Sequence, residues 1–280
     1  MASNNKAQTR VPCVLAIGGL DPGGGAGILA DARAIARTGA FASAAVAVLT
    51  VQSTSGMRSA TAVGRAELIA ECTEVVKHQY VRAIKVGALG SYENTRAIGD
   101  FLAIHRDIPA VVDTVMVPTR GRARLLEEKA IATLRDRVLP RAALVTVNAP
   151  EAQVLTGARV TRLDEAYAAV LALLKRGARA VLLKGGHLGG KHAVDLLGVA
   201  TKKAPRLIEL TAPRLELAPF HGGGCVLASL IAGRLAMSEE DYESDAETAL
   251  VDAVVWSKKK HHAALKRVID VGGDLRVVVF

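Results

Sequence analysis

Residues 221–225, His-Gly-Gly-Gly-Cys, are the part of this sequence whose residue types and spacing point most directly to chemistry. The apolar stretch 226–232 that follows them predicts a helix. Three glycines leave the backbone free to turn and to approach a ligand closely. The N–H groups at a helix N-terminus, together with the helix dipole, favour an anion. We therefore expect an anion to bind at Gly222, Gly223 and Gly224, with Cys225 as a base or nucleophile whose thiol pKa the first helical turn lowers.

A second glycine-rich loop, residues 18–27, lies at the other end of the chain. Such loops also serve as plain turns, but two of them suggest a site that holds a small substrate and a phosphate donor together. The P-loop pattern G-x-x-x-x-G-K-[ST] is absent, because the only Gly-Lys pair, 190–191, is followed by His192. The G-x-G-x-x-G pattern also fails, since its sixth position from Gly23 is Ile28. The sequence therefore supports neither a P-loop NTPase nor a Rossmann dehydrogenase.

The composition favours one α/β domain. Half of the 280 residues are apolar but only 3% are aromatic, which suits helices packed on a sheet and is poor for stacking on nucleic acid. The net charge of +9 is spread along the chain, and its one dense cluster, 258–262, does not indicate a nucleic-acid partner. We expect a flexible tail over residues 1–10 and a single domain over 11–280.

The three cysteines, Cys13, Cys72 and Cys225, show no paired spacing, which favours a reducing compartment over a disulfide framework. Cys13 and Cys72 fall in apolar patterns and are expected in the core. The longest apolar stretch, 42–51, is too short to span a bilayer, and no cleavable signal precedes it. These features predict a soluble cytoplasmic protein without a membrane partner.

Apolar runs and helical periodicity alternate along the chain. Strands are expected at 13–17, 41–49, 83–86, 110–112, 144–147 and 180–183. Helices are expected at 26–37, 66–77, 94–105, 127–137 and 164–175, with a polar loop at 50–56. The shorter runs 193–198 and 207–211 are candidates for antiparallel pairing. This alternation predicts a mainly parallel sheet with helices on both faces.

Several chemically distinctive side chains end a predicted strand or open the loop after it. In an open α/β sheet, ligands bind beyond the carboxyl ends of the strands. These residues are therefore expected to converge although they are distant in sequence: Asp21, Gln52, Asp113, Asn148, Glu151 and Lys184.

The motifs that carry these residues resemble those of a known family. Residues 19–31 look like the G-[ST]-D-x-[SG]-G-G-A-G-I-Q-A-D signature of hydroxymethylpyrimidine (phosphate) kinases of thiamine biosynthesis, in the ribokinase superfamily. Residues 49–56 are similar to that family's L-T-[AV]-Q-N-T-x-G. Further matches, in the family's order and spacing, are 85–87 (KVG), 113–116 (DTVM), 148–152 (NAPEA), 184–188 (KGGHL) and 221–225. The resemblance runs from residue 13 to about 235.

The resemblance implies a three-layer αβα ribokinase-like fold with a mainly parallel central sheet. It also implies transfer of the γ-phosphoryl of ATP, with Mg²⁺, to a pyrimidine hydroxymethyl group or to the phosphate already on it. Kinases resembling this one are often dimers, so a homodimer is expected.

The resemblance further implies a role for each matching residue. Cys225 would contact the acceptor oxygen, and the amides of Gly222, Gly223 and Gly224 with Cys225 would form an anion hole. The implied substrate pocket comprises Gly19, Asp21, Ala26, Asp31, Gln52, Ala88 and Val115. ATP would contact Asn148, Lys184 and Gly186, and Mg²⁺ would bind Asp113 and Glu151. The plainer alternatives are an inert Cys after a glycine turn, a polar loop residue at Gln52 and a first-turn helix acid at Glu151.

This sequence departs from the family pattern at several positions: Leu20, Leu29, Ala88, Thr119, Gly223 and the C-terminal stretch 272–280. Ala88 replaces a methionine, Gly223 removes a hydroxyl that could touch phosphate, and Thr119 replaces a lysine for which Arg120, Arg122 or Arg124 could substitute. Two alternatives therefore stay open. One is a pyridoxal or pyridoxine kinase, and the other is a catalytically silent homologue that binds a pyrimidine or nucleotide.

Overall fold

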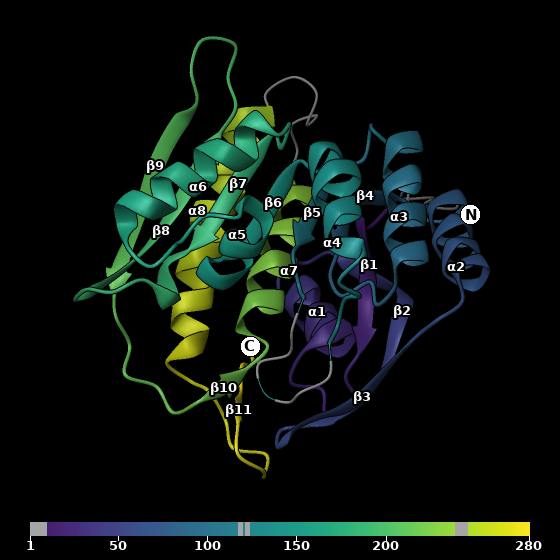
Figure 1. Ribbon diagram of the computed structural model, residues 1–280. Helices are drawn as coiled ribbons and strands as arrows, with labels where there is room; N and C mark the ends of the chain where they lie inside the picture. The colour runs from purple at the N-terminus through teal and green to yellow at the C-terminus, as the bar shows by residue number, and fades with distance from the viewer. Residues whose placement is uncertain (1–9, 117–119, 121–123, 239–245) are drawn as a thin grey trace, which may run out of the picture.

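The computed structural model describes residues 10–116, 120, 124–238 and 246–280, and its centre is a nine-stranded sheet (Figure 1). The strand order is β3-β2-β1-β4-β5-β6-β7-β8-β9. Neighbouring strands from β2 to β7 pair in parallel, whereas β3, β8 and β9 pair antiparallel at the two edges. The strands are β1 (Cys13–Leu20), β2 (Phe41–Ser53), β3 (Gly56–Ala62), β4 (Val81–Val86), β5 (Ala110–Asp113), β6 (Leu144–Asn148), β7 (Ala180–Lys184), β8 (His192–Val199) and β9 (Arg206–Pro213). The predicted mainly parallel sheet is confirmed.

Helices cover both faces of the sheet, so the structure has the three layers that were predicted (Figure 1). One face carries α2 (Arg65–His78), α3 (Tyr92–Ile104), α4 (Ala130–Thr133), α5 (Ala149–Thr156) and α6 (Leu163–Lys175). The other carries α1 (Gly27–Ala36), α7 (Gly223–Ala236) and α8 (Ala246–Leu265).

Side chains of β1, an interior strand of the sheet, pack alternately into the two layers. Leu15 and Ile17 of β1 join the core cluster under α2–α6, whereas Val14 and Ala16 join the cluster under α1, α7 and α8. Successive side chains of a strand point to opposite faces, so a strand buried on both sides reads as a continuous apolar run. For this reason the residues of β1 are apolar throughout and do not alternate between apolar and polar side chains.

Two predicted elements differ from the structure, and one helix was not predicted. The loop expected at 50–56 is wrong, because β2 continues to Ser53 and forms a hairpin with β3. The helix expected at 127–137 begins only at Ala130 and passes into a π-helical turn (Leu134–Val138) and a 3₁₀ turn (Leu139–Arg141). Pro140 has no N–H to donate, so a regular helix cannot continue through it. Helix α5 was missed, although Asn148 and Glu151 form a capping box at its start.

The C-terminal stretch returns to the glycine loop. Strand β11 (Arg276–Val277) pairs in parallel with β10 (Phe220–His221), immediately before α7. The Leu275 N–H also donates to the Thr54 carbonyl at 3.0 Å. The stretch 272–280, which departs from the family's C-terminal motif, therefore lies beside the glycine run 221–225 and the turn that contains Thr54.

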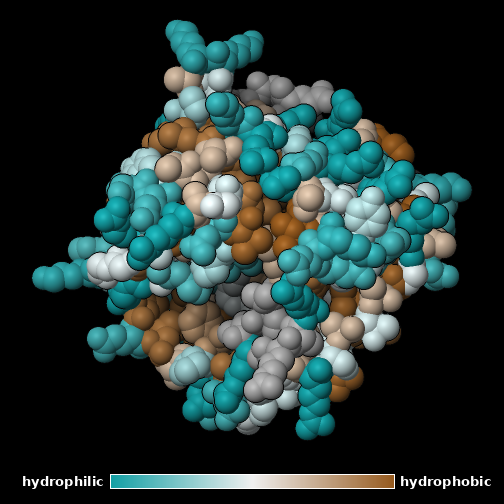
Figure 2. Space-filling model, in the orientation of Figure 1, coloured by the Kyte–Doolittle hydropathy of each residue, from teal (hydrophilic) through white to brown (hydrophobic). Residues whose placement is uncertain are grey.

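Hydrophilic side chains surround smaller hydrophobic patches on the face shown in Figure 2. No helix within the described residues is long and apolar enough to cross a membrane. Of the predicted tail, 1–10, all but the last residue lie outside the described residues. The single domain over 11–280 stays a prediction.

Candidate active site

A cavity of about 780 Å³ lies beyond the carboxyl ends of the parallel strands. All sixteen residues that the resemblance placed in the site line it, and so do the six residues expected to converge there. Asp113, Asn148 and Lys184 are the last residues of β5, β6 and β7, which explains how the sheet brings them together. The volume lies in the range of pockets that hold small-molecule ligands.

The two glycine-rich loops meet backbone to backbone in this cavity. Gly222 precedes α7 with a φ of +82°, and a Cβ there would overlap the Gly25 carbonyl oxygen. Gly27, with a φ of +56°, opens α1 in the same way against the Gly19 carbonyl. Only glycine combines this backbone conformation with this approach. The predicted helix after the glycines is confirmed, and Cys225 lies in its first turn.

Asp21 fixes the shape of the first loop and connects it to the second. Its Oδ1 accepts a hydrogen bond from the Gly23 N–H at 2.9 Å, and its Oδ2 accepts one from the Ala26 N–H at 2.9 Å. Nε2 of His221 lies 3.0 Å from Oδ2. Burial acts to raise the pKa of Asp21, but these partners together hold it below its usual value. The carboxylate is thus an internal brace between the loops.

Gln52 projects from the end of β2 and is engaged by His221. Its Nε2 lies 2.6 Å from Nε2 of His221, a buried side chain. A glutamine amide can donate and accept along one edge of a ring, as the resemblance requires. His221 therefore orients the residue expected to read the pyrimidine, a role that sequence reasoning did not assign to it. Its place at the start of the glycine run was the available signal.

Asp31 is buried inside α1 and paired on both carboxylate oxygens. Nζ of Lys85 lies 2.8 Å from Oδ2, and the Ser229 hydroxyl donates to Oδ1 at 2.8 Å. The side chains of Lys85 and Asp31 are 1% and 0% exposed. Burial acts to lower the pKa of Lys85, but the Asp31 charge raises it above its usual value. Lys85, which sequence reasoning left without a role, thus ties β4 to α1 beneath the cavity.

Asp113 and Lys184 form the second buried ion pair. Nζ of Lys184 and the Thr146 hydroxyl donate to Oδ1 of Asp113 at 2.8 and 2.7 Å. Burial acts to raise the pKa of Asp113, and Lys184 with Lys85 brings it below its usual value. A carboxylate at the end of β5 and a lysine at the end of β7, with β6 between them, can present one anionic and one cationic group to a phosphate and its counterion.

Glu151 takes part in the capping box that starts α5. Its Oε2 accepts from the Asn148 N–H at 2.9 Å and from the Thr114 hydroxyl at 3.1 Å. Burial raises the pKa of Glu151 to about 7, with Asp113 adding to the shift and Lys184 opposing it. Glu151 therefore does act as an acidic residue in the first turn of a helix, the plainer alternative weighed from the sequence. Its expected role in binding Mg²⁺ would be in addition to this one.

The expectation that the thiol pKa of Cys225 is lowered is wrong for the ligand-free site. Burial raises the pKa to about 12, Asp113 and Asp31 add to the effect, and Lys85 opposes it. The first turn of a helix does not compensate for desolvation of the thiol and for the nearby carboxylates. Cys225 is thus a neutral thiol that can position an acceptor oxygen, rather than a ready thiolate base. Cys13 and Cys72 are buried, as expected.

The departures from the family pattern fall at different distances from the cavity. Ala88 lies on its wall, 3.7 Å from where a Cβ on Gly19 would be, and shares that wall with Met116. Arg120 pairs with Asp274 and Arg124 with Glu128, both on the surface, so neither substitutes for the missing lysine here. Thr119 and Arg122 lie outside the described residues.

Comparison with known proteins supports one family. The sequence profile described as phosphomethylpyrimidine kinase matches residues 21–275. The chain belongs to the phosphomethylpyrimidine kinase family. It is 37% identical over 253 residues to the hydroxymethylpyrimidine/phosphomethylpyrimidine kinase of Rhizobium meliloti, covering 90% of this chain and 89% of that one. It is 40% identical over 231 residues to the kinase of that name from Streptomyces coelicolor, covering 81% and 82%.

Solved structures agree with this assignment to the phosphomethylpyrimidine kinase family. The phosphomethylpyrimidine kinase of Clostridium difficile 630 superposes with a TM-score of 0.71 at 28% identity, over 90% of this chain and 99% of that one. An ADP complex of Bacillus subtilis pyridoxal kinase gives a TM-score of 0.81 at 21% identity, over 96% and 97%. The second likeness shows a shared fold.

The residues of this phosphomethylpyrimidine kinase family member fit a magnesium ion that arrives with phosphate. Among the described residues, no group of three or more His, Cys, Asp or Glu side chains is placed to hold a metal alone. Mg²⁺ usually takes one or two carboxylates, and phosphate oxygens and water complete its shell. Asp113 and Glu151, which both line the cavity, supply such a partial set.

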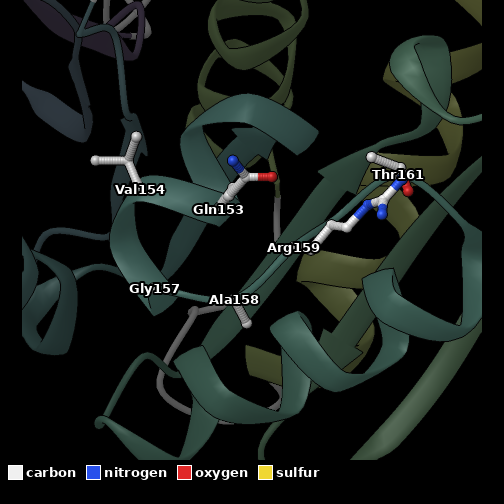
Figure 3. Close-up of a pocket in the computed structure, with 6 residues that line it drawn as sticks. All are labelled: Gln153, Val154, Gly157, Ala158, Arg159 and Thr161. Carbon is white, nitrogen blue, oxygen red and sulfur yellow. The ribbon is translucent and has the colours of Figure 1, made fainter.

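A separate hollow lies at the C-terminal end of α5 (Figure 3). It is lined by Gln153, Val154, Gly157, Ala158, Arg159 and Thr161. None of the predicted site residues reaches it, and Arg159 is the one charged side chain among the six. The predicted site residues therefore line the larger cavity and not this hollow.

Proposed function

We propose that this protein transfers the γ-phosphoryl group of ATP to 4-amino-5-hydroxymethyl-2-methylpyrimidine, to its monophosphate, or to both, in thiamine biosynthesis. One observation carries the proposal: a single cavity holds both the Gln52 amide and the glycine-lined N-terminus of α7. The first suits the edge of an aminopyrimidine, and the second suits a phosphate.

The pyrimidine would lie against Gly19, Ala88 and Val115, with its edge on Gln52. Its hydroxymethyl oxygen would face the Cys225 thiol. Because the pKa of that thiol is about 12, Cys225 would hold the oxygen in line rather than take its proton in the resting site. Asp21 and Asp31 would support this pocket through the contacts they already make.

The triphosphate would lie across the amides of residues 222–225, which are fixed before the ligand arrives. Asn148, Lys184 and Gly186 line the same part of the cavity, and Lys184 would shift from Asp113 toward phosphate oxygens. Asp113 and Glu151 would hold Mg²⁺, whose chemistry here is to neutralise charge on the transferring group.

The proposal extends to assembly and location. Phe41, Leu49 and Val51 leave large apolar side chains exposed along β2, at 59%, 50% and 57%. A second copy of the chain would cover such a surface, in keeping with the expected homodimer. A cytoplasmic location, where ATP and the pyrimidine are available, completes the proposal.

The test is ADP release with MgATP and each of three acceptors: hydroxymethylpyrimidine, its monophosphate and pyridoxal. Turnover with either pyrimidine that drops at least tenfold in Cys225→Ala supports the proposal. Tight binding of pyrimidine or nucleotide without turnover would refute it in favour of a silent homologue.

Pyridoxal is the second candidate acceptor, and one feature favours it. Ala88 leaves the wall beside Gly19 with a short side chain, where the family pattern has methionine. A larger ring would use that space. A kcat/KM for pyridoxal above that for both pyrimidines would replace the first candidate with the second.

A further inference from the structure

Helix α8 brings part of the basic cluster 258–262 to the cavity, where its role is open. His261 lines the cavity and is 8% exposed. Within the described part of the chain, neither of its ring nitrogens has a hydrogen-bond partner. A buried polar group without a partner costs free energy, so such a group in a ligand cavity points to a ligand that completes it.

The charged neighbours of His261 are already engaged. Lys258, one turn earlier on α8, pairs with Asp195 of β8 at 2.5 Å. Lys184 pairs with Asp113. Burial lowers the pKa of His261 to about 3, and Lys258 and Lys184 add to this effect. The ring is therefore a neutral imidazole, with one N–H to donate and one nitrogen to accept.

The backbone beside the ring is that of Gly223, in the anion-binding loop. Its contact with the ring acts to raise the pKa of His261, as a weak hydrogen bond would, but the contact does not have the geometry of a hydrogen bond. At this position the family pattern has threonine. Here a Cβ would lie 2.5 Å from Cε2 of Phe220, so the aromatic ring fills the space of that side chain. The loop thus lacks a hydroxyl at the point that the imidazole adjoins.

We propose that His261 is a phosphate-contacting residue, whose imidazole N–H donates to an oxygen of the nucleotide's phosphate chain where Gly223 supplies no hydroxyl. This inference rests on the proposed function, because it takes the ligand to be a nucleoside di- or triphosphate. It also gives the basic cluster a role: one face of α8 belongs to the nucleotide site, and its remaining lysines face outward.

The test is calorimetric binding of MgADP and of a non-hydrolysable MgATP analogue to wild type, His261→Leu, His261→Gln and His78→Leu. His78 is an exposed histidine of α2 and serves as the control. We expect His261→Leu to weaken nucleotide binding at least tenfold, because a hydrogen bond to a charged group is lost. His261→Gln, which keeps a donor, should recover part of the affinity, and His78→Leu should bind as wild type does.

Thermal unfolding of the same ligand-free variants separates a binding role from a structural one. His261→Leu removes an unpaired polar group from the interior, so its Tm should equal or exceed that of wild type. A lower Tm with no recovery in His261→Gln would assign His261 to packing and overturn the proposal, as would unchanged nucleotide affinity in His261→Leu. If wild type itself binds neither nucleotide, the proposed function fails first and this proposal with it.

Discussion

Lys85→Met should destabilise this protein strongly, because it removes the positive charge of the buried Lys85–Asp31 ion pair. Removing the positive charge from any other described ion pair outside the phosphate site should cost less stability. The ion pair with Asp31 is 2.8 Å long and both side chains are essentially unexposed. Without Lys85, the Asp31 carboxylate keeps the Ser229 hydroxyl but remains buried without a countercharge. Removing one partner of a buried pair costs about 3–5 kcal/mol. At roughly 2–4 °C per kcal/mol for a chain of this size, the Tm should fall by about 6–20 °C.

The assay is urea unfolding of wild type, Lys85→Met, Lys85→Met/Asp31→Asn and Lys129→Met. Lys129 is a matched control, because its pairs with Glu93 and Glu127 are on the surface and its side chain is 62% exposed. Its loss should cost less than about 1 kcal/mol. The double variant should recover most of the stability, since it removes the uncompensated charge. A loss under about 1 kcal/mol in Lys85→Met, or a double variant no better than the single, would refute the reasoning.

Three further predictions concern the cavity itself. The pKa of Glu151 is raised to about 7, so its carboxyl is protonated at lower pH and Mg²⁺ must displace that proton. MgADP affinity measured by calorimetry should therefore fall as the pH drops from about 8 to about 6. In Glu151→Gln the affinity should change with pH only through the titration of the phosphate itself. The same dependence of affinity on pH in wild type and Glu151→Gln would contradict this prediction. Gly222→Ala should lose both turnover and thermal stability, because the φ of Gly222 is +82° and the new Cβ would overlap the Gly25 carbonyl. Gly189→Ala is the control, since a Cβ there meets nothing within 4 Å, and its Tm and turnover should equal those of wild type. The half-buried Cys225, with a pKa near 12, should react with iodoacetamide at pH 8 at least about a hundredfold more slowly than a free thiol of pKa about 8.5; a comparable rate, followed by mass spectrometry, would show that the thiol is not suppressed.

The sequence was enough to predict the sheet and the cavity, for a physical reason. Buried parallel strands read as apolar runs, and the polar residue that ends each run must lie at the ligand edge of the sheet. Asp113, Asn148 and Lys184 were found in this way and line the cavity together. The β2–β3 hairpin was missed because the end of β2 and most of β3 are exposed, so their residues read as a polar loop.

The internal partners of the site could not be predicted, because they depend on distances across the fold. The sequence gives no sign that Lys85 would meet Asp31, 54 positions away, or that His221 would meet both Asp21 and Gln52. The thiol of Cys225 shows the same limit. Its place in the first turn of α7 was predicted, but the pKa depends on burial and on carboxylates from other elements.

The account's central claim is that one cavity brings a pyrimidine hydroxymethyl group and the γ-phosphate of ATP together. The most direct measurement is mass-spectrometric detection of the phosphorylated pyrimidine after incubation of the purified chain with MgATP and hydroxymethylpyrimidine. The account predicts a phosphate ester formed in step with ADP, and far less of it in Cys225→Ala. ADP released with no phosphorylated pyrimidine, or neither product despite bound nucleotide, would contradict it.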